Sequence, residues 1–529
     1  MVWRAGPRVF PALLLGMALA LVVGGAGPGP PAPLEHGPGA SDWTECRACH
    51  PAMTWSASQH DLACDACHVP FAQESSTTHL AVVTNPSALN HAKAICGPCH
   101  QLETESVLIS EHATCPDMIG HTRYLWGAQH TPEDVPEGLG LMPRPLERPR
   151  SPAMLVDDFL RRQCLRCHVG VRDASSGAVR PEGCAACHPV HGSPQTGASR
   201  EEACLRCHTG NHVGADYYGW FERDTAPMYQ QAVVRGETVL SVQGVAVHAL
   251  APDIHAQYGL GCLDCHSGDQ VMGLDPTLTP SCEGCHGGYG NRPGDRVQLW
   301  ARNGRVLEVS PIPANTPSHD QERHGRLRCS SCHGQWFFGD YGLSAMRSDA
   351  PDAARKLESS LSFHSSLLPG SLDYLSLESN TGVWVTAWRF RRWENPPLGV
   401  DRHGRIAVLR PQHQYLVSYV NRLGQVVLNS VVPERGDGSG PGWAFSPYTP
   451  HSTAPVGRSC PECHGNPTAV GQGLVWEEPG DLALLAASPP VAGDGRLLNG
   501  EEEERLLNPG IEYARDCSVA LRQRLGVEP

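Results

Sequence analysis

The cysteines of this 529-residue chain recur in a pattern that could bind a redox cofactor. Twenty of its 22 cysteines form pairs with a two-residue gap, and a histidine directly follows the second cysteine of every pair. Numbered one to ten along the chain, these sites are Cys46-Cys49-His50, Cys64-Cys67-His68, Cys96-Cys99-His100, Cys164-Cys167-His168, Cys184-Cys187-His188, Cys204-Cys207-His208, Cys262-Cys265-His266, Cys282-Cys285-His286, Cys329-Cys332-His333 and Cys460-Cys463-His464. Cys-x-x-Cys-His is the attachment signature of c-type haem, and the histidine binds one side of the iron. We therefore predict ten covalently bound haems c.

Zinc sites and redox-active dithiols also use Cys-x-x-Cys pairs. Neither requires a histidine directly after the second cysteine, yet here one follows all ten pairs. The pattern therefore argues against zinc and against disulfides for these twenty cysteines. Cys115 and Cys517 fall outside it.

The ligand on the other side of each iron decides what a haem can do. A second histidine closes the iron and favours electron transfer at low potential, whereas an open position permits substrate chemistry. Seventeen further histidines are present, enough to close all ten irons, and methionine, the competing ligand, occurs only nine times. We expect His36, His403 and His413 to be surface residues.

Twelve of the remaining fourteen histidines are the candidates for the second, distal ligand. Those shortly upstream of a motif come first: His60, His91, His255 and His324. The other candidates are His112, His121, His130, His191, His212, His248, His319 and His451. The pairing of these candidates with individual irons stays open.

The elements that position these sites should be short. Aromatic residues are only 6% of the chain, which also holds 56 Gly and 46 Pro, a composition poorly suited to long helices around an ordinary core. We predict a multihaem cytochrome c fold of low regular secondary structure, in which short helices and loops wrap on a chain of haems.

Turn sequences in the C-terminal half predict strands. Asn303-Gly304 between two apolar runs indicates a β-hairpin, and similar signals lie in 401–409 and 421–428. We therefore expect a β-rich insert near 383–432, a scaffold or alternatively a docking surface for a partner. Near the C terminus, Pro509-Gly510 should divide a helical stretch into two short helices.

The N terminus has the pattern of an export signal. Arg4 and Arg8 precede the apolar run 10–23, and small residues follow it. The alternative is an uncleaved membrane anchor, for which the run is short. Export predicts a periplasmic, outer-membrane-associated or extracellular location.

The predicted organisation follows from the spacing of the motifs and the Pro-rich stretches. It comprises a signal peptide at 1–26, a linker at 27–40, a three-haem domain at 41–130, a Pro-rich connection at 131–152, a five-haem domain at 153–290, a hairpin with the ninth haem at 291–375, the β-rich part at 376–440, the tenth haem at 441–475 and a tail at 476–529.

Two segments, 204–224 and 253–273, together with the histidines upstream of motifs, resemble the multihaem c-type cytochrome superfamily. The resemblance covers about 40–340 and 445–466. That superfamily includes respiratory and extracellular electron-transfer cytochromes and relatives of the octahaem hydroxylamine oxidoreductase and nitrite reductase type. The resemblance implies electron transfer in an exported respiratory chain, with other cytochromes or membrane quinol oxidase modules as redox partners. The net charge of −14, without a basic stripe, argues against nucleic acid as a partner.

The enzymes among such relatives use a lysine as distal ligand or a tyrosine cross-linked to the catalytic haem. Of the 41 basic residues only Lys93 and Lys356 are lysines, and we interpret Lys93 as a surface charge. The tyrosines considered, Tyr217, Tyr218 and Tyr229, lack a diagnostic context. We therefore favour an electron carrier. The alternatives are a terminal reductase or oxidase of small nitrogen, sulfur or chalcogen oxyanions with one open haem, and a homo-oligomer or filament.

A further hypothesis concerns Cys115. In related cytochromes a stretch of the form His, then Cys-x-x-Cys-His-Met, then His often follows a haem site. Here His112, Cys115, Met118 and His121 keep part of that order. Cys115 could hold an eleventh haem through one thioether bond; the alternative is an isolated cysteine.

Overall fold

The computed structural model describes residues 64–68, 85–134, 148–164, 183–188, 200–205, 207–208, 216–222, 239–242, 245–275, 279–287, 297–313, 316–351, 382–393, 396–412, 414–471 and 495–526. The predicted signal peptide and linker lie outside these residues, as do the whole of site one and most of site four.

The described helices are mostly single turns, as the composition predicted. The α-helices are α2 (Cys64–Cys67), α3 (Leu89–Ile95), α4 (Gln101–Ile109), α5 (Glu111–Thr114), α6 (Pro116–Leu125), α7 (Val156–Phe159), α8 (Arg200–Leu205), α10 (Ile254–Gln257), α11 (Cys262–Cys265), α12 (Gly268–Val271), α13 (Cys282–His286), α14 (Gln321–His324), α15 (Cys329–His333), α18 (Gly500–Leu507) and α19 (Ile511–Arg524). Turns of other pitch are η3 (Pro152–Met154), η4 (Leu160–Cys164), η6 (Gly183–Ala186), η7 (Pro317–His319), η8 (Cys460–Glu462) and η9 (Pro467–Val470). In the described part of the chain, no helix combines the length and apolar character needed to cross a bilayer.

The haem motifs themselves form helical turns. The turns α11, α13 and α15 begin at Cys262, Cys282 and Cys329. Residues three apart lie on one face of a helical turn, so both thiols of a motif can reach one porphyrin edge. Ser281 caps α13 by accepting a hydrogen bond from the Gly284 N–H at 3.0 Å. The spacing of the cysteines therefore follows from the geometry of one turn.

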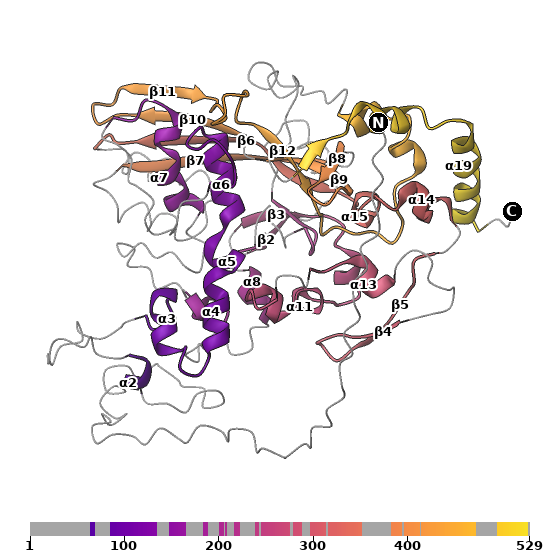
Figure 1. The fold of residues 1–529 in the computed structure, drawn as a ribbon, viewed down its shortest axis with the longest axis horizontal. Helices are drawn as coiled ribbons and strands as arrows, with labels where there is room; N and C mark the ends of the chain where they lie inside the picture. Colours follow the sequence, from indigo (N-terminus) through magenta and orange to yellow (C-terminus); the bar gives the residue numbers. More distant parts are fainter. Residues whose placement is uncertain are drawn as a thin grey trace, which may run out of the picture.

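The strands form four sheets in the described residues. They are β1 (Trp220–Glu222), β2 (Val239–Val242), β3 (Val245–Ala249), β4 (Val297–Trp300), β5 (Val306–Val309), β6 (Phe337–Ser348), β7 (Val383–Trp393), β8 (Leu398–Asp401), β9 (Ile406–Gln412), β10 (Tyr415–Val420), β11 (Val426–Val431), β12 (Ala444–Tyr448) and β13 (Gly495–Leu497). The strand orders are β1-β3-β2, β11-β10-β6-β7, β12-β9-β8-β13 and β4-β5. Strands β6 and β10 run parallel, and the other paired strands run antiparallel. The two larger sheets lie together above the motif-bearing helices α8, α11 and α13 (Figure 1).

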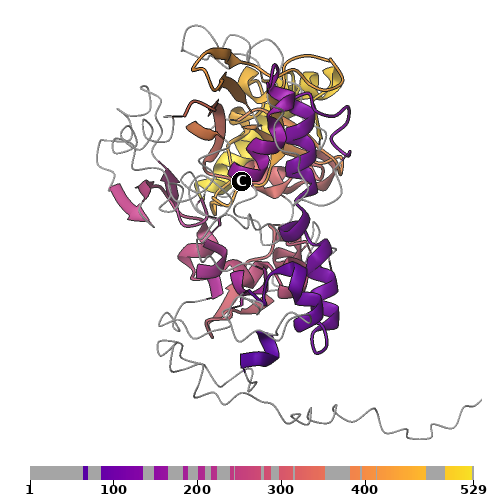
Figure 2. The ribbon, with the colours of Figure 1, turned by 90° about the vertical axis from the view of Figure 1, so that its left-hand side faces the viewer.

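Helices α6 and α7 cover one face of the β11-β10-β6-β7 sheet. Trp126, which directly follows α6, stacks on Phe159 with ring centroids 5.1 Å apart and meets Tyr415 edge-on at the same distance. All three side chains are buried, and each such aromatic pair contributes about 0.5–1.5 kcal/mol beyond the area it buries. Figure 2 shows the same helices against the strands from the side. Residues 155–160 therefore pack with the strand-rich part, although they belong by sequence to the predicted five-haem domain.

A buried ionic network joins α7 to this sheet. Asp158, almost fully buried, accepts a hydrogen bond from Trp384 Nε1 at 2.8 Å and forms ion pairs with Arg347 and Arg161. Arg347 also pairs with Asp349 at 2.9 Å. Because every one of these charges lies next to an opposite charge, the network fixes how the helix sits on the strands.

The local predictions from turn residues are confirmed. The Asn303-Gly304 turn joins β4 to β5, with Trp300 opposite Val306, and Gly304 adopts a positive φ of 83°. The 401–409 and 421–428 signals are the β8–β9 and β10–β11 hairpins. Pro509-Gly510 separates α18 from α19, as expected.

The β-rich region is larger than the predicted insert at 383–432. Strand β6 enters from upstream and pairs along its length with β7, while β12 and β13 enter from downstream. The extra strands could not be foreseen because their partners lie far away in the chain. The β1-β3-β2 sheet was not predicted either.

Candidate haem centres

At five sites the motif histidine faces a second histidine. Every partner is one of the predicted distal candidates, and the ring centroids are 6.0 to 6.4 Å apart. In the order of sites six to ten, the pairs are His208 with His112 (6.3 Å), His266 with His451 (6.4 Å), His286 with His255 (6.1 Å), His333 with His319 (6.0 Å) and His464 with His324 (6.1 Å). The structure thus selects one distal candidate for each of these sites.

This separation fits a metal ion held between two imidazoles. A metal–imidazole bond is about 2.0–2.1 Å long and the ring centroid lies ~1.1 Å beyond the nitrogen, so rings on opposite sides of one metal have centroids about 6.3 Å apart. The residues therefore fit a haem iron with histidine on both sides, next to two cysteines for covalent attachment. When bound, the haem supplies a one-electron redox couple, and two histidines leave no coordination position for a substrate.

The second ring nitrogen of these histidines is also engaged. Metal-binding histidines usually donate their other N–H to a fixed acceptor, which sets the tautomer and the ring orientation. At least seven of the ten rings do so here through Nδ1, which leaves Nε2 for the iron. The acceptors are Val271 O for His112 (3.2 Å), Asp253 Oδ1 for His255 (2.7 Å), Gln270 Oε1 for His266 (3.2 Å), Ser310 O for His286 (2.7 Å), Thr316 Oγ1 for His319 (2.9 Å), Pro317 O for His324 (3.0 Å) and Ala454 O for His333 (3.0 Å).

Burial keeps several of these rings in the neutral form that a metal requires. It lowers the pKa of His266, His319, His324 and His464. For His266, His319 and His464, the facing histidine lowers the pKa further. Since a histidine binds a metal through an unprotonated nitrogen, the lowered pKa of these rings favours the form that can bind iron.

The cysteines place sites three and five to ten in one row. Cysteine side chains of sites three and five, six and seven, and eight and nine lie next to one another: Cys96 beside Cys184, Cys204 beside Cys262, and Cys282 beside Cys329. Electrostatic neighbours join the remaining steps: Cys187 with Cys204, Cys265 with Cys285, and Cys332 with Cys460. The row therefore runs three, five, six, seven, eight, nine, ten. Its second half can be followed in Figure 1, from α8 through α11 and α13 to α15.

A loop after β12 connects neighbouring sites. The backbone N–H of His451 donates to Asp216 Oδ2 at 2.9 Å, and that of Thr453 donates to Asp253 Oδ2 at 2.7 Å. Both carboxylates are buried, at 1% and 3% exposure. The sequence reasoning missed both residues. One available signal was an acidic residue two positions before the distal candidate His255, where it can cap the turn and accept from the ring.

Four predicted distal ligands lie in the described part of the chain but do not belong to the five histidine pairs. His91 is half-buried in α3, with Nε2 3.2 Å from Asn90 Nδ2. His121 lies on α6, His130 is exposed beyond it, and His248 lies on β3. Their role as distal ligands stays a prediction.

Other predicted residues lie outside the described part of the chain. They are Cys46, Cys49, His50, His60, Cys167, His168, His191 and His212, together with Tyr229, His36 and His413. The distal ligands of sites one to five therefore stay predictions. His403 is exposed in the β8–β9 turn, as expected of a surface residue.

Cys115 lies between α5 and α6 in a left-handed conformation, with φ 42°. Its thiol donates to the Glu111 carbonyl at 2.9 Å, and its side chain is buried against an apolar cluster that includes Ile119. His112, one of the histidines that suggested an eleventh haem, faces His208 of site six. The eleventh haem stays a prediction, but these surroundings favour an isolated core cysteine.

The residues that suggested an open haem have other partners. Lys93 is 68% exposed and forms an ion pair with Glu105 at 3.6 Å, as a surface charge does. Tyr217 donates its hydroxyl to Leu260 O at 2.6 Å, and Tyr218 donates to Glu201 at 2.9 Å. None of the three points to a substrate site.

The C-terminal segment covers site ten. The Tyr513 ring lies 5.3 Å from that of His464, and Cys517 is a hydrogen-bond partner of Cys460. Cys517, which like Cys115 falls outside the ten motifs, therefore lies beside the motif of site ten.

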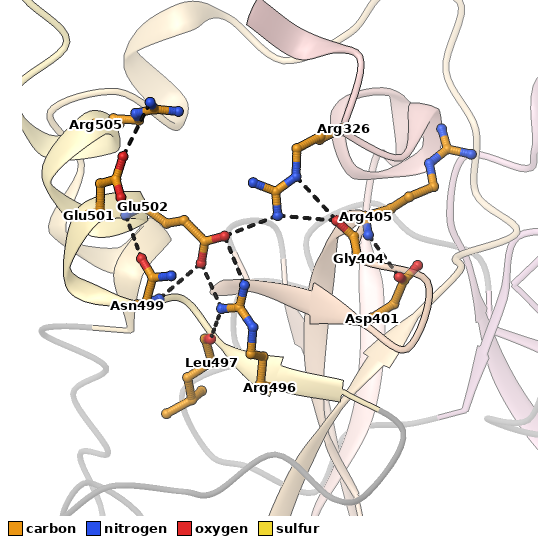
Figure 3. Close-up of polar contacts among 10 residues, drawn as sticks. All are labelled: Arg326, Asp401, Gly404, Arg405, Arg496, Leu497, Asn499, Glu501, Glu502 and Arg505. Carbon is orange, nitrogen blue, oxygen red and sulfur yellow. Dashed lines mark hydrogen bonds and ion pairs between the residues drawn. The ribbon is translucent and has the colours of Figure 1, made fainter. Parts of the chain in front are cut away.

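Figure 3 shows how this segment is held in place. Glu502 on α18 forms ion pairs with Arg496 at 2.7 Å and with Arg326 at 3.0 Å. Arg326 also donates to the Gly404 carbonyl in the β8–β9 turn. The network connects the C-terminal helices to the stretch between α14 and α15, which carry ligands of sites ten and nine.

Comparison with known proteins supports this view of the site. Residues 254–337 match the model of the cytochrome c3 family. The match spans sites seven to nine and contains His255, His319 and His324, which are three of the predicted distal ligands. This segment is therefore of the multihaem c-type cytochrome kind, which carries covalently bound c-type haem and transfers electrons. No curated protein and no solved structure matches the chain.

Proposed function

We propose that the chain is an exported electron conduit, which carries electrons through ten covalently bound haems c in a respiratory electron-transport chain. The observation that carries this proposal is the set of five facing histidine pairs at sites six to ten. Two histidines per iron hold the metal in six-coordination in both oxidation states, so electrons can pass with little rearrangement and no substrate can bind.

The row of sites supports a path through the molecule. Thiol contacts between adjacent motifs bring neighbouring attachment edges together, and the row continues to site ten beneath α19. Redox partners, either other cytochromes or membrane quinol oxidase modules, would exchange electrons at the ends of the row. A periplasmic, outer-membrane-associated or extracellular location follows from the signal pattern at 1–26.

A terminal oxyanion reductase would need one open iron. If sites six to ten each have two histidine ligands, such an iron would belong to one of sites one to five, and the exposed Lys93 gives no support to a lysine ligand there. A filament subunit would use the same conduit and continue the row between copies. The proposed conduit requires neither an open iron nor contacts between copies of the chain.

The test is a haem count combined with a spin-state measurement on the purified holoprotein. The intact mass should exceed that of the mature chain by ten haems, and the ferric electron paramagnetic resonance (EPR) spectrum should contain only low-spin signals. A high-spin signal amounting to one haem would overturn the conduit in favour of the reductase. A mass increment of eleven haems would establish the additional haem at Cys115.

A further inference from the structure

Site eight has the strongest hydrogen bonds to its ligand rings. Both of its histidines, His255 and His286, donate from Nδ1 over 2.7 Å, which is the shortest distance among the seven Nδ1 hydrogen bonds identified above. The acceptor for His255 is the carboxylate of Asp253, whereas the other Nδ1 acceptors identified are backbone carbonyls or neutral side chains. Site eight therefore differs in kind from its neighbours.

The adjacent site seven is the opposite case. His266 donates to the neutral Gln270 amide over 3.2 Å, and the buried Nδ1 of His451 has no hydrogen-bond partner among the described residues. Sites seven and eight are neighbours in the row, through Cys265 and Cys285. Two adjacent irons thus have ligands with very different hydrogen bonding.

The Asp253 side chain is fixed from both sides. Its Oδ1 accepts from Nδ1 and from the backbone N–H of His255, and its Oδ2 accepts from the Thr453 N–H at 2.7 Å. Both carboxylate oxygens therefore accept hydrogen bonds, and one of these bonds comes from the ring N–H of His255.

A carboxylate in this position affects the iron through its ligand. It draws the Nδ1 proton toward itself, which makes the imidazole a stronger electron donor and favours the ferric state. Its buried negative charge also stabilises the more positive ferric form, and the low dielectric of the interior strengthens this effect. Both effects make the reduction potential more negative.

We infer that Asp253 is a positioning residue that sets the potential of site eight and makes it the most negative of sites six to ten. The inference rests on the proposed function, because it requires that the rings of His255 and His286 hold a haem iron. Electrons that leave site eight for site seven then move downhill, and electrons in the other direction meet a barrier. Asp253 would thus introduce an energetic step inside the conduit.

The experiment is a redox titration of the full-length holoprotein, followed by EPR of the low-spin signals. His255→Met identifies the step of site eight, because a methionine ligand shifts that step to more positive potential. Asp253→Asn should displace the same step in the same direction. The expected displacement is about tenfold in the ferric–ferrous equilibrium, or about 59 mV for one electron. Asp253→Glu, which keeps the charge, should restore most of the original position.

Asp216→Asn is the matched control. Asp216 is an equally buried carboxylate that holds the same loop, and its Oδ2 accepts from the backbone N–H of His451 and from Tyr448 Oη. It should leave the step of site eight in place. An Asp253→Asn protein whose site-eight step does not move, or moves no more than in Asp216→Asn, would overturn the inference.

A second measurement covers the case in which Asp253→Asn fails to assemble. In the wild-type protein, the step identified by His255→Met should have the most negative potential among sites six to ten. A more negative potential at site six, seven, nine or ten contradicts the inference. Failure of the conduit proposal looks different, because it would appear as a high-spin iron in the unmodified protein.

Discussion

His451 lies across site seven from His266, although the two residues are far apart in the chain. The histidines immediately upstream of motifs also serve other sites. His255 precedes site seven but faces His286 of site eight, and His324 precedes site nine but faces His464 of site ten. Each of these two histidines thus faces the site beyond the motif that it directly precedes.

Removal of one distal histidine should open one iron. We predict that His112→Ala converts site six from low-spin to high-spin and lets its ferrous form bind carbon monoxide, because His112 is the ring that faces His208. EPR and the carbon monoxide difference spectrum measure both effects. His403→Ala, an exposed turn residue, is the control and should change neither. An unchanged spectrum for His112→Ala would refute the pairing.

The sequence alone indicates the predicted attachment residues, but it does not indicate how the histidines pair. Cysteine spacing is local, because one helical turn determines it. Ligand pairing is not local, since it depends on loops such as the one that Asp216 and Asp253 hold against site seven. The composition could supply a set of candidates, and only the arrangement in space could select His112, His319 and His451 from it.

At the scale of elements, the C-terminal helices act as a cover for site ten. Glu502 holds them through Arg326 and Arg496, and its pKa is lowered to about 2, chiefly by the hydrogen bond from Arg496. A carboxylate with a lowered pKa stabilises the folded form at and above its ordinary titration range. This contribution is lost as the pH falls toward about 2, so it is constant at neutral pH.

We predict that Glu502→Gln weakens the attachment of α18 and α19 by about 2 kcal/mol, the usual contribution of hydrogen bonds to a charged group. Hydrogen exchange of amides in 500–526 should become roughly 30-fold faster, while exchange in β6 and β7 stays the same. Glu501→Gln is the matched control, because Glu501 is 78% exposed and pairs only with Arg505 on its own helix. Equal effects of the two variants would contradict a specific role for Glu502.

The β-rich part has its own stabilising centre at Asp158. Replacement by asparagine would leave Arg347 buried without its full counter-charge. We therefore predict that Asp158→Asn destabilises this part by about 3–5 kcal/mol, measured by chemical denaturation or exchange of β6 and β7 amides. Asp117→Asn, which disrupts only an exposed pair with Arg402 at 4.0 Å, should cost little. The haem count should be the same in both variants.

The hairpins could be predicted because they depend on local sequence, whereas the sheets could not because they join distant segments. Gly404 and Gly424 adopt positive φ in tight turns, so a short sequence determines each hairpin. The pairing of β6 with β7 and the parallel contact of β6 with β10 join distant segments. The alternation of residues in a strand indicates which face is buried but not which strand lies beside it.

At the scale of the whole molecule, the sites form a row between a helical N-terminal part and the C-terminal cover. The row follows chain order over sites six to ten, because successive motifs of the chain lie next to one another. The large sheets lie to one side of this row (Figure 1). We interpret them as the scaffold that holds the loop with His451 and the turn that contacts Arg326.

The most direct test of this account is a diffraction experiment on the holoprotein at the iron absorption edge. It predicts one anomalous peak midway between the rings of each of the five histidine pairs, about 2.0 Å from each Nε2, in the order six, seven, eight, nine, ten. An iron bound to only one ring of a pair, or a row that connects the sites in another order, would contradict it.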